Sequence, residues 1–188
     1  EPDKPKSDTA QKLESKVESV PEFNLEEEKM EEPKEHHVQT SHISVPQLVS
    51  NVLSQEEINT ILNVCSFDER EKSCYWIQNT ELPLFIQRIQ NMVNIESQYF
   101  ENICVTKYKS GIHRDHLDAY DLNSEKGKTY TKDRGQRLMT ITGFLSTTTV
   151  KFPKFDKILD CQQGSILFYK NCHDNSNQRD ERYTTSYQ

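Results

Sequence analysis

The strongest constraint on the fold is a run of short, alternating segments in the second half of the chain. Residues 137–145 show it best, because apolar side chains recur at alternate positions and two threonines stand between them. Successive side chains of a strand point to opposite faces. The two faces are Met139, Ile141 and Leu145 on one side, and Leu138, Thr140, Thr142 and Phe144 on the other. A strand with an apolar face and a hydroxyl-bearing face suits a barrel wall that lines a polar cavity.

Other strand-like segments lie on both sides of this one, and two helix-like segments come before most of them. The predicted strands are residues 43–49, 74–77, 102–108, a short strand around His116, 149–152, 165–169 and 182–187. Ser54 and Glu57 match a capping box, so Ser54 is the predicted N-cap of the first helix. A second helix is predicted to open at Thr80, with Pro83 in its first turn, where the missing N–H costs nothing. This order of parts predicts an α+β fold with a β-sandwich or jelly-roll core.

Composition divides the chain into two parts and excludes some classes of protein. Residues 1–40 are mostly Glu, Lys, Pro and Ser, and a segment with so little to bury cannot repay its ordering entropy. We therefore predict a disordered acidic linker or tail over residues 1–40, with an interaction tail as the functional alternative, and a folded domain over 41–188. The net charge of −7 argues against a nucleic-acid-binding surface, which needs a basic face. No apolar run is long enough to span a membrane.

The five cysteines do not form a metal-binding pattern. No Cys-x-x-Cys pair occurs, which argues against a structural zinc site. Cys65 and Cys74 are close enough in the sequence for a disulfide, and the odd count leaves at least one free thiol. A single bridge and five reduced, partly buried thiols are both open on this basis.

A long polar segment separates two of the predicted strands. Residues 119–135 include Gly127 and Gly135 and show no sustained apolar periodicity. They are predicted to be a long mobile loop, and loops of this length in compact domains often close over active sites.

The candidate chemistry begins at His116 and Asp118. Side chains two residues apart in a strand point to the same face, so an imidazole and a carboxylate would stand side by side. This pair is two-thirds of the two-histidine, one-carboxylate set that holds non-haem Fe(II) and leaves positions open for substrates.

The order of these parts resembles the prolyl 4-hydroxylase branch of the Fe(II)/2-oxoglutarate dioxygenases. The matching pieces are residues 51–57, Gln87–Gln90 leading to Phe100–Asn102, Tyr108-x-x-Gly111, His116-x-Asp118, Gly135–Thr140, Phe152-Pro153 and Gly164–Phe168. Together they cover most of residues 43–188. No single piece is specific, but their order and spacing make a chance match improbable.

The resemblance implies a double-stranded β-helix with two or more supporting N-terminal helices, and an oxidative reaction. It implies that Fe(II) and 2-oxoglutarate activate O2, that L-ascorbate serves as reductant, and that a peptide or protein substrate, usually at proline, is hydroxylated. His116 and Asp118 match the iron ligands, while Tyr108 and Thr140 match positions in the 2-oxoglutarate pocket. The compartment is open between the secretory pathway, including the endoplasmic reticulum, and the cytoplasm.

The sequence departs from the family pattern at the second histidine, and two alignments are possible. In the first, which we favour, Asp180 matches a family aspartate and Thr185 falls where the histidine should be. The basic residue that the resemblance implies for 2-oxoglutarate would then lie beyond Gln188. In the second, His173 is the ligand and Arg182 is the carboxylate anchor. The second alignment leaves too little chain for the usual crossing to the next strand.

Two functions from different classes therefore follow from the sequence. The chain is either an Fe(II)/2-oxoglutarate-dependent dioxygenase that hydroxylates a peptidyl residue, most simply proline, or a catalytically impaired relative that binds peptide or protein. A threonine hydroxyl is a poor ligand for Fe(II), so Thr185 at the position of the second histidine favours the second function.

Overall fold

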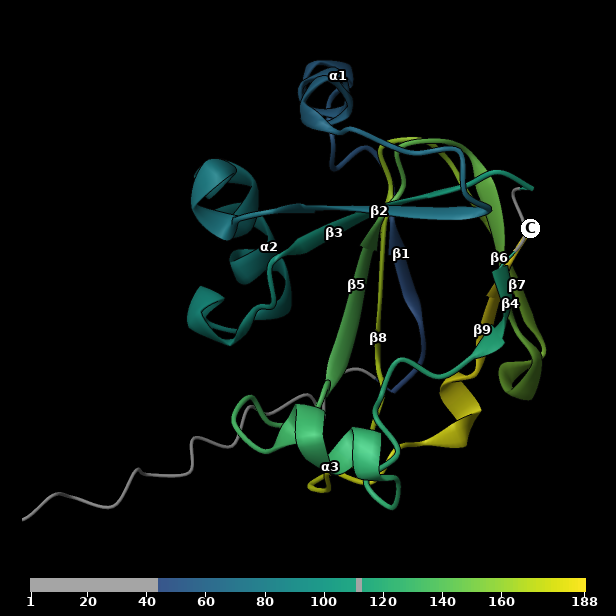
Figure 1. Cartoon of the computed structure of the whole chain (residues 1–188). Coiled ribbons are helices and arrows are strands. Elements are labelled where there is room, and N and C mark those ends of the chain that lie inside the picture. Colours follow the sequence, from purple (N-terminus) through teal and green to yellow (C-terminus); the bar gives the residue numbers. More distant parts are fainter. Residues whose placement is uncertain (1–43, 111–112) are drawn as a thin grey trace, which may run out of the picture. The chain divides into compact units, whose positions relative to one another are not determined.

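The computed structural model of the protein describes residues 44–110 and 113–188, which form helices and antiparallel sheets (Figure 1). The helices are α1 (Gln55–Val64), α2 (Pro83–Val93) and α3 (Glu125–Thr131). The strands are β1 (Gln47–Val49), β2 (Lys72–Ile77), β3 (Ile103–Tyr108), β4 (His113–His116), β5 (Met139–Gly143), β6 (Thr148–Phe152), β7 (Lys157–Cys161), β8 (Ile166–Lys170) and β9 (Thr185–Tyr187). The predicted α+β class is confirmed, while the predicted tail of residues 1–40 lies outside the described residues.

The strands are arranged in three antiparallel sheets. One sheet has the order β1-β8-β5, a second has the order β4-β9-β6-β7, and β2 pairs with β3. In Figure 1 the first sheet runs through the middle of the view and the four-stranded sheet stands to its right. Most neighbours in the two larger sheets are far apart in the sequence, so each sheet brings together distant parts of the chain.

The main core lies between the two larger sheets. Its buried members are Phe144, Val150, Phe152, Cys161, Leu167, Tyr169 and Tyr183. Phe144, Leu167 and Tyr169 come from the segment around the first sheet, and Val150 and Phe152 come from β6 of the second. Apolar side chains from both inner faces fill the space, as in a sandwich.

The opposite face of β5 and β8 is covered by α2. Met139 and Ile141 of β5 pack there with Ile89 and Val93 of the helix. The predicted alternation of β5 is thereby confirmed, because its threonines face the other way, and Thr140 reaches Asp118. α1 packs instead with β2 and β3, through Ile58 and Ile61.

Both predicted helices form. The Ser54 hydroxyl accepts from the Glu57 amide, and the Glu57 carboxylate accepts from the Ser54 amide, so the capping box is confirmed. The second helix begins at Pro83 rather than Thr80, because residues 79–81 form a short 3-10 turn rather than its first turn. No described helix is both long and apolar enough to cross a membrane.

Two sequence-based expectations need correction, and one strand was not predicted. Residues 119–135 are not a structureless loop, since they contain α3, which Ser124 caps by accepting from the Gly127 amide. The Gln136 side chain bonds both the amide and the carbonyl of Tyr120, which holds the start of this segment beside its end. The strand β7 is not among the predicted ones. All five cysteines are free thiols, so the alternative of a Cys65–Cys74 bridge is wrong.

Truncating the core between the sheets is expected to be costly. Phe152 is fully buried, and Phe152→Ala should lower the free energy of unfolding by about 3–5 kcal/mol, because a cavity adds to the lost burial. Ile158→Ala on the adjacent strand is the matched control, since Ile158 is 67% exposed and should change stability by about 0.5 kcal/mol or less. Urea denaturation measures both, and equal effects would contradict this account of the core.

Candidate functional site

The candidate site is built on the pairing of β4 with β9. His116 lies opposite Thr185 and His113 lies opposite Tyr187, so β4 advances three residues where β9 advances two. The extra residue is a β-bulge, which shifts side chains from one face to the other. His113 and His116 would face opposite sides of a regular strand, but here their rings lie together with centroids 4.0 Å apart.

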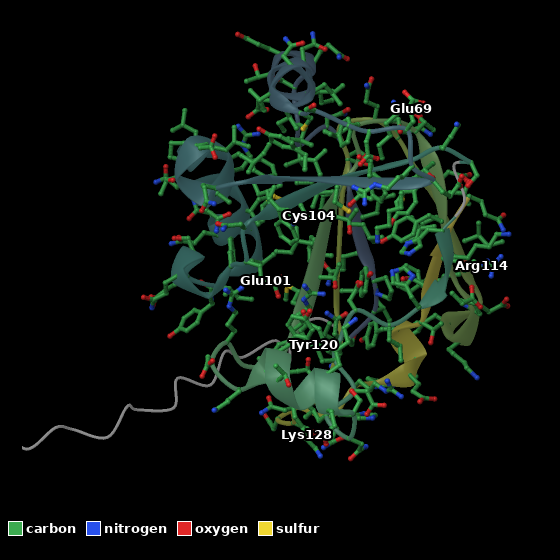
Figure 2. The ribbon with its side chains drawn as sticks, viewed as in Figure 1. Glu69, Glu101, Cys104, Arg114, Tyr120 and Lys128 are labelled. Carbon is green, nitrogen blue, oxygen red and sulfur yellow. The ribbon has the colours of Figure 1, made fainter. Side chains whose placement is uncertain are left out.

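His116 presents one ring nitrogen to Asp118. Its Nδ1 lies 3.0 Å from the carbonyl oxygen of Arg114, which is labelled at the right of Figure 2. A carbonyl can only accept, so Nδ1 carries the proton and Nε2 is left to face the carboxylate. The distance from Nε2 to Asp118 Oδ1 is 3.5 Å. The predicted juxtaposition of these two side chains is therefore present, although Asp118 lies just beyond the end of β4.

The second carboxylate oxygen of Asp118 is fixed by two hydroxyl groups. Thr140 and Tyr169 each donate to Oδ2 at 2.7 Å, and Thr140 in turn accepts from the Asn171 amide at 2.9 Å. Burial acts to raise the pKa of Asp118, but His116 and the two hydroxyls outweigh it and hold the pKa at about 2. The carboxylate is therefore ionised and oriented, with Oδ1 turned toward His116.

The Asp118 carboxylate affects the pKa of His116. Burial acts to lower the pKa of His116, but the Asp118 carboxylate together with backbone groups of Arg114 and Thr185 outweighs it, and the net shift is upward. In the absence of a cation, a proton on Nε2 can stabilise the pair.

An aromatic column extends from the pair. The Tyr108 hydroxyl lies 3.2 Å from His113 Nδ1, and the two rings stack with centroids 4.8 Å apart. Tyr187 lies alongside, with its ring 5.8 Å from His113 and 5.9 Å from His116. Burial, followed by the neighbouring His116, lowers the pKa of His113 to about 4, so this imidazole is neutral near pH 7. Tyr108, which is predicted to lie in the co-substrate pocket, thus contacts His113, and His113 in turn contacts His116.

Thr185 stands opposite His116 on β9, at the position where the resemblance calls for the second histidine. Thr185 is 1% exposed, and its hydroxyl is close enough to Tyr169 to act on the pKa of that phenol. Apart from this contact with Tyr169, the hydroxyl has no hydrogen-bond partner among the described residues.

His173 and Arg182 are engaged elsewhere. His173 Nδ1 lies 3.5 Å from Asp180, and its side chain is 56% exposed. Arg182 donates to the same carboxylate through Nε and Nη2. Within residues 44–110 and 113–188, no three His, Cys, Asp or Glu side chains are placed so as to hold a metal ion. His116 and Asp118 thus offer two donors suited to Fe(II), while the position beside them carries a hydroxyl in place of an imidazole.

The comparison with solved structures identifies the fold. No protein-family model and no curated protein matches the sequence. Among solved structures, the 2OG complex of the viral collagen prolyl hydroxylase from Paramecium Bursaria Chlorella virus-1 matches with a TM-score of 0.58 and 18% identity, over 75% of this chain and 85% of that one. A truncated form of the same enzyme gives a TM-score of 0.56 and 18% identity, over 75% of this chain and 80% of that one. The chain has the fold of the prolyl hydroxylases.

Within this prolyl hydroxylase fold, several residues of the site were not predicted from the sequence. They are His113, Tyr169, Asn171 and Tyr187. The spacing of His113 and His116 gives no signal, because it places them on one face only when the strand is bulged. Tyr169 belongs to a predicted strand, but nothing in the sequence indicates that it points at Asp118.

Proposed function

We propose that the protein is an Fe(II)- and 2-oxoglutarate-dependent dioxygenase that hydroxylates a peptidyl residue, with proline as the first candidate. The two larger sheets would then be the halves of a double-stranded β-helix, with His116 and Asp118 beside the pairing of β4 with β9. The single observation that carries the proposal is the approach of His116 Nε2 to Asp118 Oδ1.

Nε2 and Oδ1 are both acceptors when His116 is neutral. The proton of the ring is on Nδ1, where Arg114 accepts it, and Asp118 is ionised. Two lone pairs that face each other at 3.5 Å are stabilised by a positive charge between them, either a proton or a metal cation. An imidazole nitrogen and a carboxylate oxygen are the donors expected for a non-haem Fe(II) site.

The remaining residues have positioning roles in this proposal. Bound iron and 2-oxoglutarate would supply the oxidation with O2 as the oxidant: one oxygen atom would enter succinate as the co-substrate loses CO2, the other would enter a substrate C–H bond as a hydroxyl group, and L-ascorbate would keep the iron reduced. Thr140 and Tyr169 hold Asp118 through Oδ2, which would leave Oδ1 to bind a metal together with His116. Tyr108 is the proposed hydroxyl partner of 2-oxoglutarate, and Thr140 also lines that pocket.

Thr185 favours a second candidate function. Because it stands where the resemblance calls for a histidine, the chain could bind a peptide or protein partner in the same fold without turnover. The two candidates differ in whether the site binds a metal and the keto acid.

A turnover assay with matched binding measurements separates them. Purified protein with Fe(II), 2-oxoglutarate and ascorbate is expected to form succinate, and a proline-containing peptide should accelerate it. His116→Ala should remove this activity, while His173→Ala should leave it unchanged. Absence of succinate together with absence of Fe(II)-dependent 2-oxoglutarate binding would reject the dioxygenase and leave the binding module.

A further inference from the structure

We propose that His113 supplies the second imidazole of the metal site, so that the site is formed by His113, His116 and Asp118. This inference rests on the proposed function, because it concerns the same metal position. The donor set is then two imidazoles and one carboxylate, which is the set that Fe(II) sites of this type use. The second imidazole comes from β4 itself rather than from β9, where Thr185 stands.

The bulge in β4 makes this possible. Without the extra residue, His113 would point away from His116, since they are three positions apart. With it, both imidazoles and the Asp118 carboxylate lie on one side of the strand, as the 4.0 Å ring separation and the 3.5 Å Nε2–Oδ1 distance show. Bulges often redirect side chains next to active sites.

Each imidazole also has an oxygen next to its Nδ1. His116 Nδ1 bonds the Arg114 carbonyl, and His113 Nδ1 lies within hydrogen-bond distance of the Tyr108 hydroxyl. Histidines that bind metals commonly use one ring nitrogen for the metal and the other for an oxygen nearby. In His116 this leaves Nε2 as the donor for a cation, and in His113 it does so when Nδ1 carries the proton and donates to Tyr108.

The Thr185 hydroxyl lies at the same place. It is buried across the ladder from His116, and Tyr169 is its hydrogen-bonding neighbour among the described residues. Because a hydroxyl can both donate and accept, it could also bond a water bound to a metal ion there without being a direct ligand.

Metal binding must turn the His113 ring. The ring now lies 4.0 Å from that of His116 and is tilted by 38° to it, and no three donors meet at one point in the described residues. The turn is a change in the side-chain torsions of one half-buried residue, and side chains make such changes between staggered positions.

The test is metal affinity, measured without turnover. Mn(II), an air-stable substitute for Fe(II), is titrated into the full chain by calorimetry. His113→Phe keeps an aromatic ring in the stack but has no donor nitrogen, and we expect it to weaken Mn(II) binding by more than about tenfold, since loss of even an outer partner of a metal ligand costs at least that much. His173→Phe is the matched control and should bind as the wild type does. His113→Gln, checked by circular dichroism, serves if the Phe variant does not fold.

A spectroscopic count of imidazoles provides a second readout. Electron spin-echo modulation of Cu(II) bound to the chain should report two imidazole ligands in the wild type and one in His113→Phe. If His116→Ala and Asp118→Ala abolish Mn(II) binding but His113→Phe binds normally, the inference is overturned while the proposed function stands. If the wild type itself binds no Mn(II), both are rejected.

Discussion

Asp118→Asn is expected to lower the affinity for Fe(II) or Mn(II) by about a hundredfold or more, and to remove metal-dependent 2-oxoglutarate binding with it. The carboxylate is the one anionic donor of the proposed site, and loss of outer partners of metal ligands alone costs about 10–100-fold. Isothermal titration of the metal, followed by titration of the keto acid, measures both effects.

The fold should survive this substitution. The side-chain carbonyl of the new amide can still accept from Thr140 and Tyr169, and its NH2 group can donate to the Nε2 lone pair of His116. The free energy of unfolding is expected to fall without loss of the fold, because the lowered pKa of Asp118 means that its ionised form stabilises the folded state. Asp115→Asn on the same strand is the charge-matched control, because Asp115 is exposed, and it should keep the wild-type affinity. Wild-type metal affinity in Asp118→Asn would remove Asp118 from the site.

Thr185→His should have the opposite effect on the metal. An imidazole would then stand directly across the ladder from His116, and affinity for Mn(II) or Fe(II) should rise by at least about tenfold, as expected when a hydroxyl is replaced by a good ligand. The gain is expected whether or not His113 also binds. In the His113→Phe background, the same substitution should restore metal binding.

The metal-free Thr185→His variant should be less stable than the wild type. Thr185 is fully buried, and a larger side chain there is expected to cost about 1–3 kcal/mol. Saturating metal should then raise the melting temperature, because a ligand that binds only the folded state stabilises that state. The free energy of unfolding increases by about 2.7 kcal/mol when the free metal concentration is a hundred times Kd. Thr184→His, on the preceding residue, is the control for position. An equal metal-dependent rise in melting temperature in that variant would contradict the assignment of position 185 to the metal site.

The local features of the fold could be predicted because each has a short-range physical cause. The capping box at Ser54 is a matter of two side chains three residues apart. The alternation of β5 follows from strand geometry, and it correctly places Thr140 opposite the apolar face that packs on α2. The resemblance to the prolyl hydroxylases is confirmed for the fold.

The features that the sequence does not reveal depend on contacts between distant parts of the chain. The segment that contains α3 is anchored by Gln136, which bonds Tyr120, and by the bidentate contact of Arg137 with Glu101, which is labelled in Figure 2. Its own sequence has little helical periodicity, so a loop is the simpler prediction. The bulge in β4 is equally hidden, because it is defined only by the register with β9. The role proposed for His113 could therefore not be predicted from its position in the sequence.

The order of strands also has a consequence for how the chain acquires its structure during synthesis. Among the described residues, β1 pairs with β8 and β4 pairs with β9, and neither has a second partner strand there. Such distant pairings close large loops, which slows folding relative to proteins with local contacts. The residues that surround Asp118 should consequently be assembled late, after the ribosome has released the chain as far as Tyr187. Until then the edges of β4 and β5 are open, and a chaperone that covers exposed strand edges is expected to increase the yield of folded protein.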